Sequence, residues 1–344
     1  MNDDTVLIVN PKSNSGSTGK NWDSIYHTLC DFFGDNIEVV FTKKEGDGTA
    51  LARSYLKRGF KNIIPIGGDG MINEVANGFF EEDPEIQEVD LNTETSLLPP
   101  LALKPINPKA IMAILPSGTR NVLVQSLNLP NDFEECCKIL GNCNTSKKID
   151  VIAALVTDPE NPSKWVKRVF LNAAEIGIGA EIISKAKDMR KKVNSRLLST
   201  IAGIATTIPT YKSNICEITT GMDKEDNKMD NKIITKMTMG IIANGRFLGG
   251  GVQAAIKATM NDGLLDIVII KDSDGLAFLK EAISMKNDDT STTEVGENIY
   301  YSQSKNVSLI SKEEKDVIVT MDGEPIGTLP AFFKVFPNLL TIRI

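Results

Sequence analysis

The fold is decided by the stretch Ile63-Ile64-Pro65-Ile66-Gly67-Gly68-Asp69-Gly70-Met71-Ile72-Asn73-Glu74-Val75. An apolar run that leads into three glycines is typical of a buried strand entering a tight turn. Helical spacing from Met71 to Phe80 places those glycines at a strand-to-helix junction. Because glycines let the backbone approach an anion and a helix start offers unpaired N–H groups, the junction predicts a phosphate site. A plain glycine turn is the alternative.

Asp69 narrows the chemistry of this turn. An acidic side chain suits a phosphate that carries a metal ion, or a hydroxyl that is to lose its proton, better than it suits a bare phosphate. The turn therefore favours a nucleotide site in which Asp69 faces Mg²⁺ or an acceptor hydroxyl.

Strands and helices alternate on both sides of the junction. The sequence predicts strands over residues 6–9, 37–41 and 62–66 and helices over residues 20–33 and 48–58. This order is typical of a parallel sheet with covering helices. The polar loop from Asn10 to Lys20 is a second candidate for anion binding, with Lys12 and Lys20 as its cations. It is not a P-loop, since Lys20 is followed by Asn21.

A second glycine junction follows an acidic, proline-bearing segment, residues 81–109, that we interpret as a surface insertion. A strand over residues 110–115 leads into Pro116-Ser117-Gly118-Thr119-Arg120-Asn121 and a helix from Val122. In an open parallel sheet such junctions gather at the carboxyl ends of the strands. Two of them facing one crevice favour a nucleotide cleft.

The pattern changes after a predicted helix over residues 132–140. Strand-like runs separated by turns follow, which is typical of a β-sandwich or an open barrel. They cover residues 149–156, 166–172, 213–219, 236–242, 263–270, 307–310, 317–321 and 339–344. The polar stretches 221–232 and 286–298 are predicted to be hairpin loops.

A helical segment with a basic run interrupts this half. Residues 185–192 carry five lysines and arginines and lead into an apolar helix of small residues that ends near Pro209. The region 185–209 could rest on an anionic bilayer and admit a lipid tail. The alternative is a solvated charged face followed by a core helix.

Composition limits the class of protein. The chain has 344 residues, of which 41% are hydrophobic, so it can bury two cores. Its formal net charge of −7 disfavours nucleic-acid binding. No signal peptide and no apolar run long enough to span a membrane is evident. Five cysteines without metal-binding spacing are typical of reduced thiols in a cytoplasmic protein, and the single histidine, His27, argues against a histidine metal site. Any contact with the membrane would be peripheral.

Seven motifs in order resemble the diacylglycerol-kinase catalytic family, which includes bacterial lipid kinases, sphingosine kinases and ceramide kinases. The motifs are Asn10-Pro11, Gly67-Gly68-Asp69-Gly70 with Asn73-Glu74, residues 115–121, Asn172 with Gly177-Ile178-Gly179, residues 244–251, residues 261–266 and Asp322-Gly323-Glu324-Pro325. They cover nearly the whole chain. One such motif would be weak evidence, but their shared order is specific.

The resemblance implies two domains with the active cleft between them. Residues 1–130 would form an α/β nucleotide-binding domain, a parallel sheet with helices like that of phosphofructokinase and NAD kinase. Residues 131–344 would form a β-rich, sandwich-like domain for the lipid substrate. The implied reaction transfers the γ-phosphoryl group of ATP to a lipid hydroxyl with Mg²⁺.

The resemblance also assigns residues to this reaction. It makes Asp322 the proton acceptor, although turn chemistry alone favours an ordinary turn aspartate at this position. Turn chemistry, as above, makes Asp69 the partner of Mg²⁺ or of the hydroxyl. The nucleotide would be bound by Asn10, Lys12, Thr42, Gly67, Gly68, Asp69, Gly70, Met71, Ile72, Asn73, Glu74, Gly118, Thr119, Asn121 and Glu324. A further metal turn would consist of Thr259, Asp262 and Leu264, where an ordinary hairpin is the alternative.

Three positions depart from the family pattern. Met71 stands where a threonine is usual, Val122 replaces an aspartate, and Ile256 replaces a proline. The first two leave open a lipid- or nucleotide-binding regulator without turnover. A kinase that phosphorylates NAD or a small polyol through the same glycine motif is the other alternative. The lipid acceptor is open among diacylglycerol, a sphingoid base, phosphatidylglycerol and an isoprenoid alcohol, and an oligomer is compatible with the sequence.

Overall fold

The computed structural model describes residues 4–34, 37–82, 101–118, 120–142, 145–190, 193, 195–221, 231–249, 251–272 and 298–344. The N-terminal half contains a parallel set of short strands around β1 (Thr5–Val9). β1 pairs in parallel with β2 (Glu38–Phe41) and β3 (Asn62–Gly67), and β3 pairs in parallel with β4 (Ile111–Ala113) and β5 (Leu115–Pro116). Every residue of β1 is buried, as expected for a strand covered on both faces.

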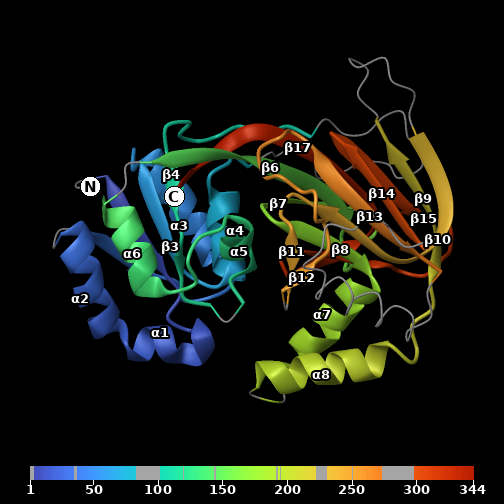
Figure 1. Cartoon of the computed structure of the whole chain (residues 1–344), viewed down its shortest axis with the longest axis horizontal. Helices are drawn as coiled ribbons and strands as arrows, with labels where there is room; N and C mark the ends of the chain where they lie inside the picture. Colours follow the sequence, from blue (N-terminus) through green and yellow to red (C-terminus); the bar gives the residue numbers. More distant parts are fainter. Residues whose placement is uncertain are drawn as a thin grey trace.

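Helices cover the two faces of these strands (Figure 1). Because side chains alternate along a strand, Val6 and Ile8 pack toward α3 (Asp47–Lys57) and α4 (Asp69–Gly78). Leu7 and Val9 pack on the other face, toward α2 (Trp22–Phe33) and α6 (Phe133–Asn142). The shorter helical segments are η1 (Asn14–Gly16), α1 (Ser17–Lys20) and α5 (Val122–Ser126).

The domain boundary that we placed at residue 130 stays a prediction, and two segments beyond it complete the first core. Cys137 and Leu140 of α6 are buried against Leu29 of α2. The end of β17 (Glu324–Arg343) pairs in parallel with β4, with Thr341 opposite Ile111. The last strand of the chain therefore joins the sheet that the first strands begin.

The C-terminal half is mainly antiparallel. Strands β17, β16, β8, β10, β9 and β15 pair in that order, and β15 pairs again with β17, so they close into a ring. Closure removes the unpaired edges that an open sheet exposes. The strands are β6 (Ser146–Thr157), β7 (Trp165–Phe170), β8 (Ala173–Gly177), β9 (Asn214–Thr220), β10 (Asn231–Ala243), β11 (Phe247–Leu248), β12 (Val252–Gln253), β13 (Leu265–Lys271), β14 (Ile299–Ser304), β15 (Asn306–Ser311) and β16 (Ile318–Met321).

Two helices, α7 (Ile178–Arg190) and α8 (Arg196–Thr207), lie together at one end of this ring (Figure 1). Their backbones approach closely, since a Cβ on Gly203 would lie 2.8 Å from the carbonyl oxygen of Ile182. Ser195 caps α8 by accepting a hydrogen bond from the amide of Leu198. Among the described helices, none is long and apolar enough to cross a bilayer.

The predicted hairpin loops 221–232 and 286–298 lie mostly outside the described residues, which exclude 222–230 and 273–297. Of the segment that we interpreted as an insertion, residues 83–100 also lie outside them. Its end packs inward, since Leu103 and Ile106 contact the first core and Leu101 contacts Trp165 and Phe332. The end of the segment is thus part of the packed structure rather than a surface excursion.

Candidate active site

A cavity of about 850 Å³ lies where the glycine junctions of the N-terminal half face α7, α8 and the strands of the ring. Its lining changes along its length. One end is lined by polar loops and carboxylates, including Asn10, Lys12, Thr42, Asp69, Asn73 and Asp322. The other end is lined by apolar side chains, including Ile182, Ile183, Ile204, Met239, Ile241 and Leu248.

The two glycine turns of the polar end touch each other. A Cβ on Gly118 would lie 2.5 Å from the Cα of Gly68, so only glycine lets the turns approach this closely. The amide of Ser117 donates a hydrogen bond of 3.1 Å to the carbonyl oxygen of Gly67. Motifs that are 50 residues apart in the sequence thus form one surface.

Gly67 lies behind this surface, and Met71 explains why it is a glycine. A Cβ on Gly67 would lie 2.6 Å from the Cβ of Met71. The Met71 side chain is buried, and its methyl group approaches Gly48 at the start of α3. The residue that replaces the usual threonine therefore fills space between two helices.

A chain of hydroxyl groups ties the first loop to the second glycine turn. Ser13 Oγ donates to Thr18 Oγ1, and Thr18 Oγ1 is hydrogen-bonded to Ser117 Oγ, each at 2.6 Å. Asn10 Oδ1 accepts a hydrogen bond from the backbone amide of Lys12. The Lys12 side chain itself is exposed and lines the cavity. These bonds fix the loop without using its cation.

Two of the predicted nucleotide-binding side chains, Glu74 and Asn121, hydrogen-bond to backbone amides of the protein. Glu74 accepts hydrogen bonds from the amides of Gly46 and Gly48, at 3.0 and 2.9 Å, and so anchors the start of α3. Asn121 does not line the cavity; its Oδ1 accepts from the amide of Gly118, and its Nδ2 donates to Asn131 Oδ1 at 2.7 Å. Both side chains are occupied within the protein.

Asn73 joins the two halves of the molecule. Its Nδ2 donates to the carbonyl oxygen of Val169 at 3.0 Å and to Asp322 Oδ2 at 2.9 Å. One turn later, Asn77 exchanges two hydrogen bonds with the backbone of Val169. The helix that follows the first glycine turn is thereby held against β7.

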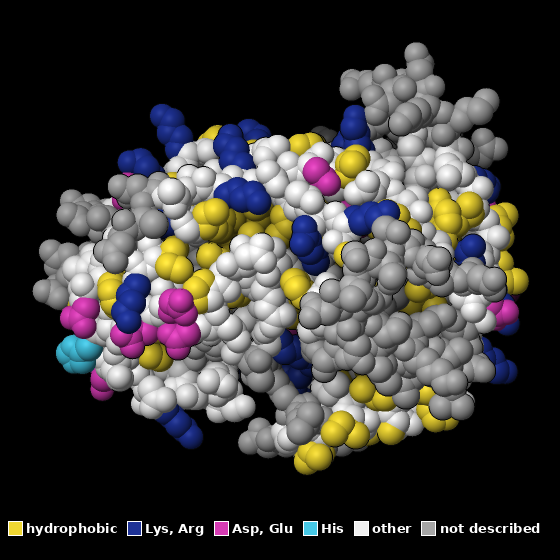
Figure 2. Space-filling model, in the orientation of Figure 1, with side chains coloured by type: hydrophobic (Ala, Val, Ile, Leu, Met, Phe, Trp, Pro, Cys, Tyr) yellow, Lys and Arg dark blue, Asp and Glu magenta, His cyan; other side chains and the backbone are white. Residues whose placement is uncertain are grey.

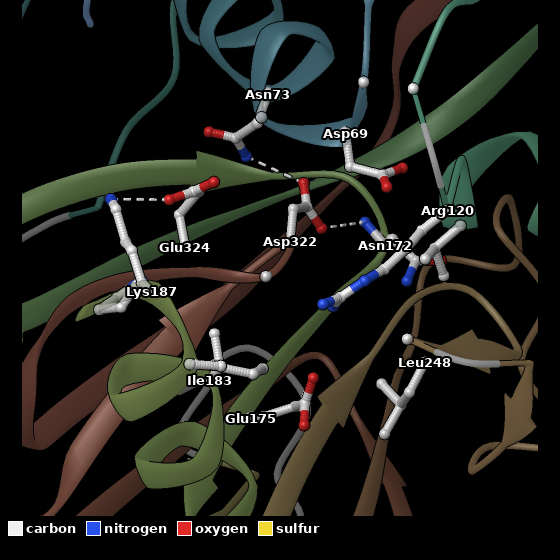
Figure 3. A pocket seen from close by; sticks show the side chains of 18 of the residues that line it. Asp69, Asn73, Arg120, Asn172, Glu175, Ile183, Lys187, Leu248, Asp322 and Glu324 are labelled. Atoms are coloured by element: carbon white, nitrogen blue, oxygen red, sulfur yellow. Dashed lines mark hydrogen bonds and ion pairs between the residues drawn. The ribbon is translucent and has the colours of Figure 1, made fainter. Parts of the chain in front are cut away.

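The carboxylate of Asp322 accepts four hydrogen bonds, and Figure 3 draws those from Asn73 and Asn172. Besides Asn73, the donors are the backbone amides of Leu171, Asn172 and Ala173, at 3.0 to 3.2 Å. Burial raises the pKa of Asp322, and the four donors oppose that shift. Asp322 also has a positive φ of 48°, which an aspartate tolerates better than most residues. Its side chain faces the cavity from the bottom of a turn.

Asp69 lies near Asp322 in the cavity (Figure 3). It starts α4, and its Oδ1 accepts a long hydrogen bond of 3.4 Å from the amide of Leu123 at the start of α5. Burial raises the pKa of Asp69, and the negative charge of Asp322 raises it further. The two predicted catalytic carboxylates are therefore close enough to influence each other.

Glu324 completes the contact between the halves. A Cβ on Gly70 would lie 3.1 Å from Glu324 Oε1, so the carboxylate touches the first glycine turn. Lys187 of α7 pairs with Glu324 at 2.9 Å and with Glu45 at 3.3 Å. This lysine belongs to the basic run that we assigned to a membrane contact, and here it bridges the mouth of the cavity.

Sequence reasoning did not single out Glu175 or Arg120, although both line the cavity. Glu175 lies on β8 between Ala174 and Ile176, whose side chains face the opposite side in the core of the ring. Burial raises the pKa of Glu175 to about 7, and the positive charge of Arg120 opposes the shift. The sequence did contain a signal for Glu175, since a charged residue within an apolar strand is unusual. Because side chains alternate along a strand, Glu175 faces α7 rather than the core of the ring.

The apolar end is bounded by α8, which has two different faces. Thr200, Ile204 and Ile208 line the cavity, whereas Leu198 and Ile201 are 56% and 52% exposed. Figure 2 shows hydrophobic side chains along the lower edge of the molecule, where α8 lies. The helix thus separates the cavity from an apolar outer surface.

The predicted metal residues lie apart from this cavity. Thr259, Asp262 and Leu264 do not line it, and Asp262 Oδ1 accepts from the amide of Leu264 within the turn. Across the described residues, no group of three His, Cys, Asp or Glu side chains could hold a metal ion. At the polar end, Asp69 Oδ1 accepts a long hydrogen bond of 3.4 Å, whereas Asp322 accepts four shorter ones. One carboxylate with the phosphates of a nucleotide is a usual donor set for Mg²⁺, so Asp69 fits such an ion.

The cavity brings together most of the predicted site residues. Those that line it are Asn10, Lys12, Thr42, Gly68, Asp69, Gly70, Met71, Ile72, Asn73, Glu74, Gly118, Asp322 and Glu324. Gly67 and Asn121 lie behind the lining, and Thr119 is outside the described residues. Their binding and catalytic roles stay predictions.

Known proteins resemble both halves of the chain. Residues 4–154 match the family model of the diacylglycerol kinase catalytic domain, and residues 172–344 match that of the YegS C-terminal NAD kinase beta sandwich-like domain. A protein of Salmonella arizonae named "Probable lipid kinase YegS" is 26% identical over 99% of this chain and 96% of its own length. A "Probable lipid kinase YegS-like" protein of Enterobacter sp. is 27% identical over 90% and 86%. The crystal structure of a diacylglycerol kinase from Bacillus anthracis shares the fold, with a TM-score of 0.64, 23% identity and coverage of 99% and 96%.

Proposed function

Since the chain belongs to the diacylglycerol kinase catalytic-domain family, we propose that it is an ATP-dependent lipid kinase. It would transfer the γ-phosphoryl group of ATP to a hydroxyl group of a diacylglycerol-like lipid. The observation that carries this proposal is the two-ended cavity, in which a polar end that contains Asp69 and Asp322 continues into an apolar end. Such a shape suits a charged donor and an apolar acceptor that meet at a carboxylate.

The polar end would hold the triphosphate. The turns at Gly68 and Gly118 present backbone to the cavity, and α4 begins there with its unpaired amides. Lys12 adds a cation at the edge. In a loose phosphoryl-transfer transition state, positioning and charge stabilisation dominate the rate, so rigid turns are the main contribution of this end.

Asp69 would hold Mg²⁺ together with the phosphates. The ion would neutralise part of the negative charge that develops on the phosphoryl oxygens. The carboxylate is prepared for this task, because α4 and its hydrogen bond to the start of α5 fix its position. Glu74 and Asn121 would contribute by holding the loops around it.

Asp322 would accept the proton of the lipid hydroxyl. All four hydrogen bonds of its carboxylate are made by the protein, so the hydroxyl would replace Asn73 as the donor to Oδ2. Burial, which raises the pKa of Asp322, would strengthen it as a base. The three backbone amides would keep it oriented throughout.

The apolar end would receive the acyl chains. The side chains of α7, α8, β10 and β13 line it, and the exposed Leu198 and Ile201 lie on the outer face of α8. That face would contact the bilayer from which the lipid comes. Of the basic run, Lys185 is paired with Glu181 and Lys187 bridges two glutamates, so they would add little to such a contact.

Labelled ATP tests the proposal directly. The purified protein is incubated with Mg²⁺, labelled ATP and a total lipid extract, and the labelled product is identified. We expect label in a phospholipid fraction that is absent without protein. Label transferred to NAD or a polyol instead would identify the related kinase, and ATP binding without any labelled lipid would identify a regulator.

A further inference from the structure

Arg120 is a cation in the cavity that none of the motif assignments uses. It lies in the second glycine turn, two residues after Gly118, and it lines the cavity. Gln125 Nε2 donates a hydrogen bond of 3.2 Å to its carbonyl oxygen, which fixes its backbone. A Cβ on Gly249 would lie 3.1 Å from Arg120 Nη1, so the guanidinium reaches the opposite half of the molecule. The side chain therefore crosses the cavity at the boundary between its two ends.

The guanidinium lies in a negative environment without forming an ion pair. Burial raises the pKa of both Asp69 and Glu175, and the positive charge of Arg120 opposes both shifts, so it is within electrostatic range of both carboxylates. Figure 3 shows it in the same part of the cavity as Asp322 and Glu175. No salt bridge joins it to a side chain in the part of the chain that the structure describes. Its five donors are available to a ligand.

The geometry of arginine indicates what that ligand is. A planar guanidinium matches two oxygens of a phosphate group and binds them more tightly than a lysine would. The position also matters, because a phosphoryl group arriving here would meet the negative charges of Asp69, Asp322 and Glu175. One cation among these carboxylates removes much of that repulsion.

We propose that Arg120 binds a phosphate group on the acceptor side of the cavity, an inference that rests on the proposed kinase function. This phosphate has two sources. It is the γ-phosphoryl group of the nucleotide during its transfer, or it is a phosphate that the lipid acceptor already carries, as phosphatidylglycerol does. In the first case Arg120 would stabilise the phosphoryl group during transfer, and in the second it would favour lipids that carry a phosphate.

Binding measurements with two nucleotides test the first source. Calorimetric affinities for ATP and ADP, each with Mg²⁺, are compared for the wild type and Arg120→Gln. If Arg120 contacts the γ-phosphoryl group, the variant loses at least about tenfold in ATP affinity and keeps its ADP affinity within about twofold. Arg120→Lys should lose less, because it keeps the charge without the planar fork. Equal losses for ATP and ADP would overturn the assignment.

Vesicles test the second source. The wild type and Arg120→Gln are titrated with vesicles of phosphatidylcholine containing either phosphatidylglycerol or diacylglycerol. If Arg120 contacts the lipid phosphate, the variant loses the preference for phosphatidylglycerol by at least about tenfold. A folded variant that keeps both the ATP-over-ADP preference and the lipid preference of the wild type refutes the proposal.

Arg58→Gln is the matched control. Arg58 stacks over the rings of Tyr55 and Phe60 outside the cavity, so this variant makes the same change of charge without touching the site. Thermal unfolding confirms that all variants are folded. If Arg120 controls ATP preference but no lipid in a total extract is ever phosphorylated, the kinase proposal fails while the phosphate assignment stands.

Discussion

The polar end of the cavity is built around two glycine turns that touch backbone to backbone, whereas its apolar end is lined by aliphatic side chains. At the polar end, two glycine turns touch at Gly68 and Gly118, and a chain of hydroxyl groups ties the second turn to the first loop. At the apolar end, residues such as Ile183 and Ile204 project from α7 and α8 at positions outside the shared motifs. A close backbone contact restricts its positions to glycine, whereas many combinations of apolar residues can form a lining of similar shape.

This difference explains which part of the function is specific in sequence. Phosphate needs amides, charge and close approach at fixed points, and those requirements leave recognisable residues. A lipid tail needs only apolar area, and pockets with similar lining distinguish related chains weakly. The sequence therefore predicts the proposed nucleotide-binding end of the cavity, but it does not identify the lipid that the apolar end would bind. The four predictions below test this contrast.

Asp322→Asn should have the largest effect, because Asp322 serves both ends. Removing the proposed base should lower the rate of lipid phosphorylation by about 10² to 10⁴-fold. The asparagine NH₂ group would also face backbone amides that now donate to the carboxylate, which costs about 1–3 kcal/mol of stability. Kinetic assays and urea unfolding measure the two effects. Wild-type turnover in a folded variant would exclude Asp322 as the base.

Gly118→Ala should have the next largest effect, and it tests the close contact between the two glycine turns. Its Cβ would lie 2.5 Å from the Cα of Gly68, so the turns must separate, at about 1–3 kcal/mol of stability. Gly68→Ala is the matched variant: its Cβ would lie 3.3 Å from the Cα of Gly118, and its φ of −90° suits alanine. We expect it to cost under about 1 kcal/mol. Equal costs in urea unfolding would mean that the turns do not depend on this contact.

Glu175→Gln tests the one carboxyl that faces the apolar end. Burial raises its pKa from 4.5 to about 7, so ionisation destabilises the folded state progressively as the pH rises from 4.5 through 7. Glutamine never ionises. The variant should therefore nearly match the wild type at pH 4.5 and be more stable at pH 8 by about 3 kcal/mol, because each unit of pKa shift contributes about 1.4 kcal/mol. Unfolding curves at both pH values measure this, and a difference that does not change with pH would contradict it.

Ile204→Asn should have the smallest effect and tests the apolar lining. It places a polar group in the cavity, so the KM for the lipid should rise about fivefold, while the KM for ATP should not change. Ala205→Asn makes a similar change one residue along α8, on its exposed face, and should leave both constants unchanged. A rise in both constants for Ile204→Asn would show that the two ends do not act separately.

Much of the site was predictable because its residues lie in motifs with a physical reason. The glycine junctions, Asp69, and Asp322 within Met-Asp-Gly-Glu-Pro are local patterns, and the cavity contains all of them. Arg120 and Glu175 were not predictable in the same way. Each became significant only through its neighbours across the cavity, such as Gly249 for Arg120 and Gly179 for Glu175.

The fold was predictable to a similar extent. Alternating strands and helices indicated the first half, and short strands with turns indicated the second. The strand predicted over residues 339–344 is instead the end of the 20-residue β17, which pairs with both halves. No local pattern specifies a strand that changes partners along its length, because its pairing depends on distant segments.

The sequence by itself determined the local elements, the two glycine turns, the absence of a strong basic charge and the membership of a kinase family. These follow from residues close together in the chain, where propensity and turn chemistry act directly. The tertiary structure decided that Gly68 meets Gly118, that Asn73 donates to Asp322, and that α7 and α8 form the wall of an apolar chamber. These contacts join residues up to 249 positions apart, and only packing of the whole chain brings them together.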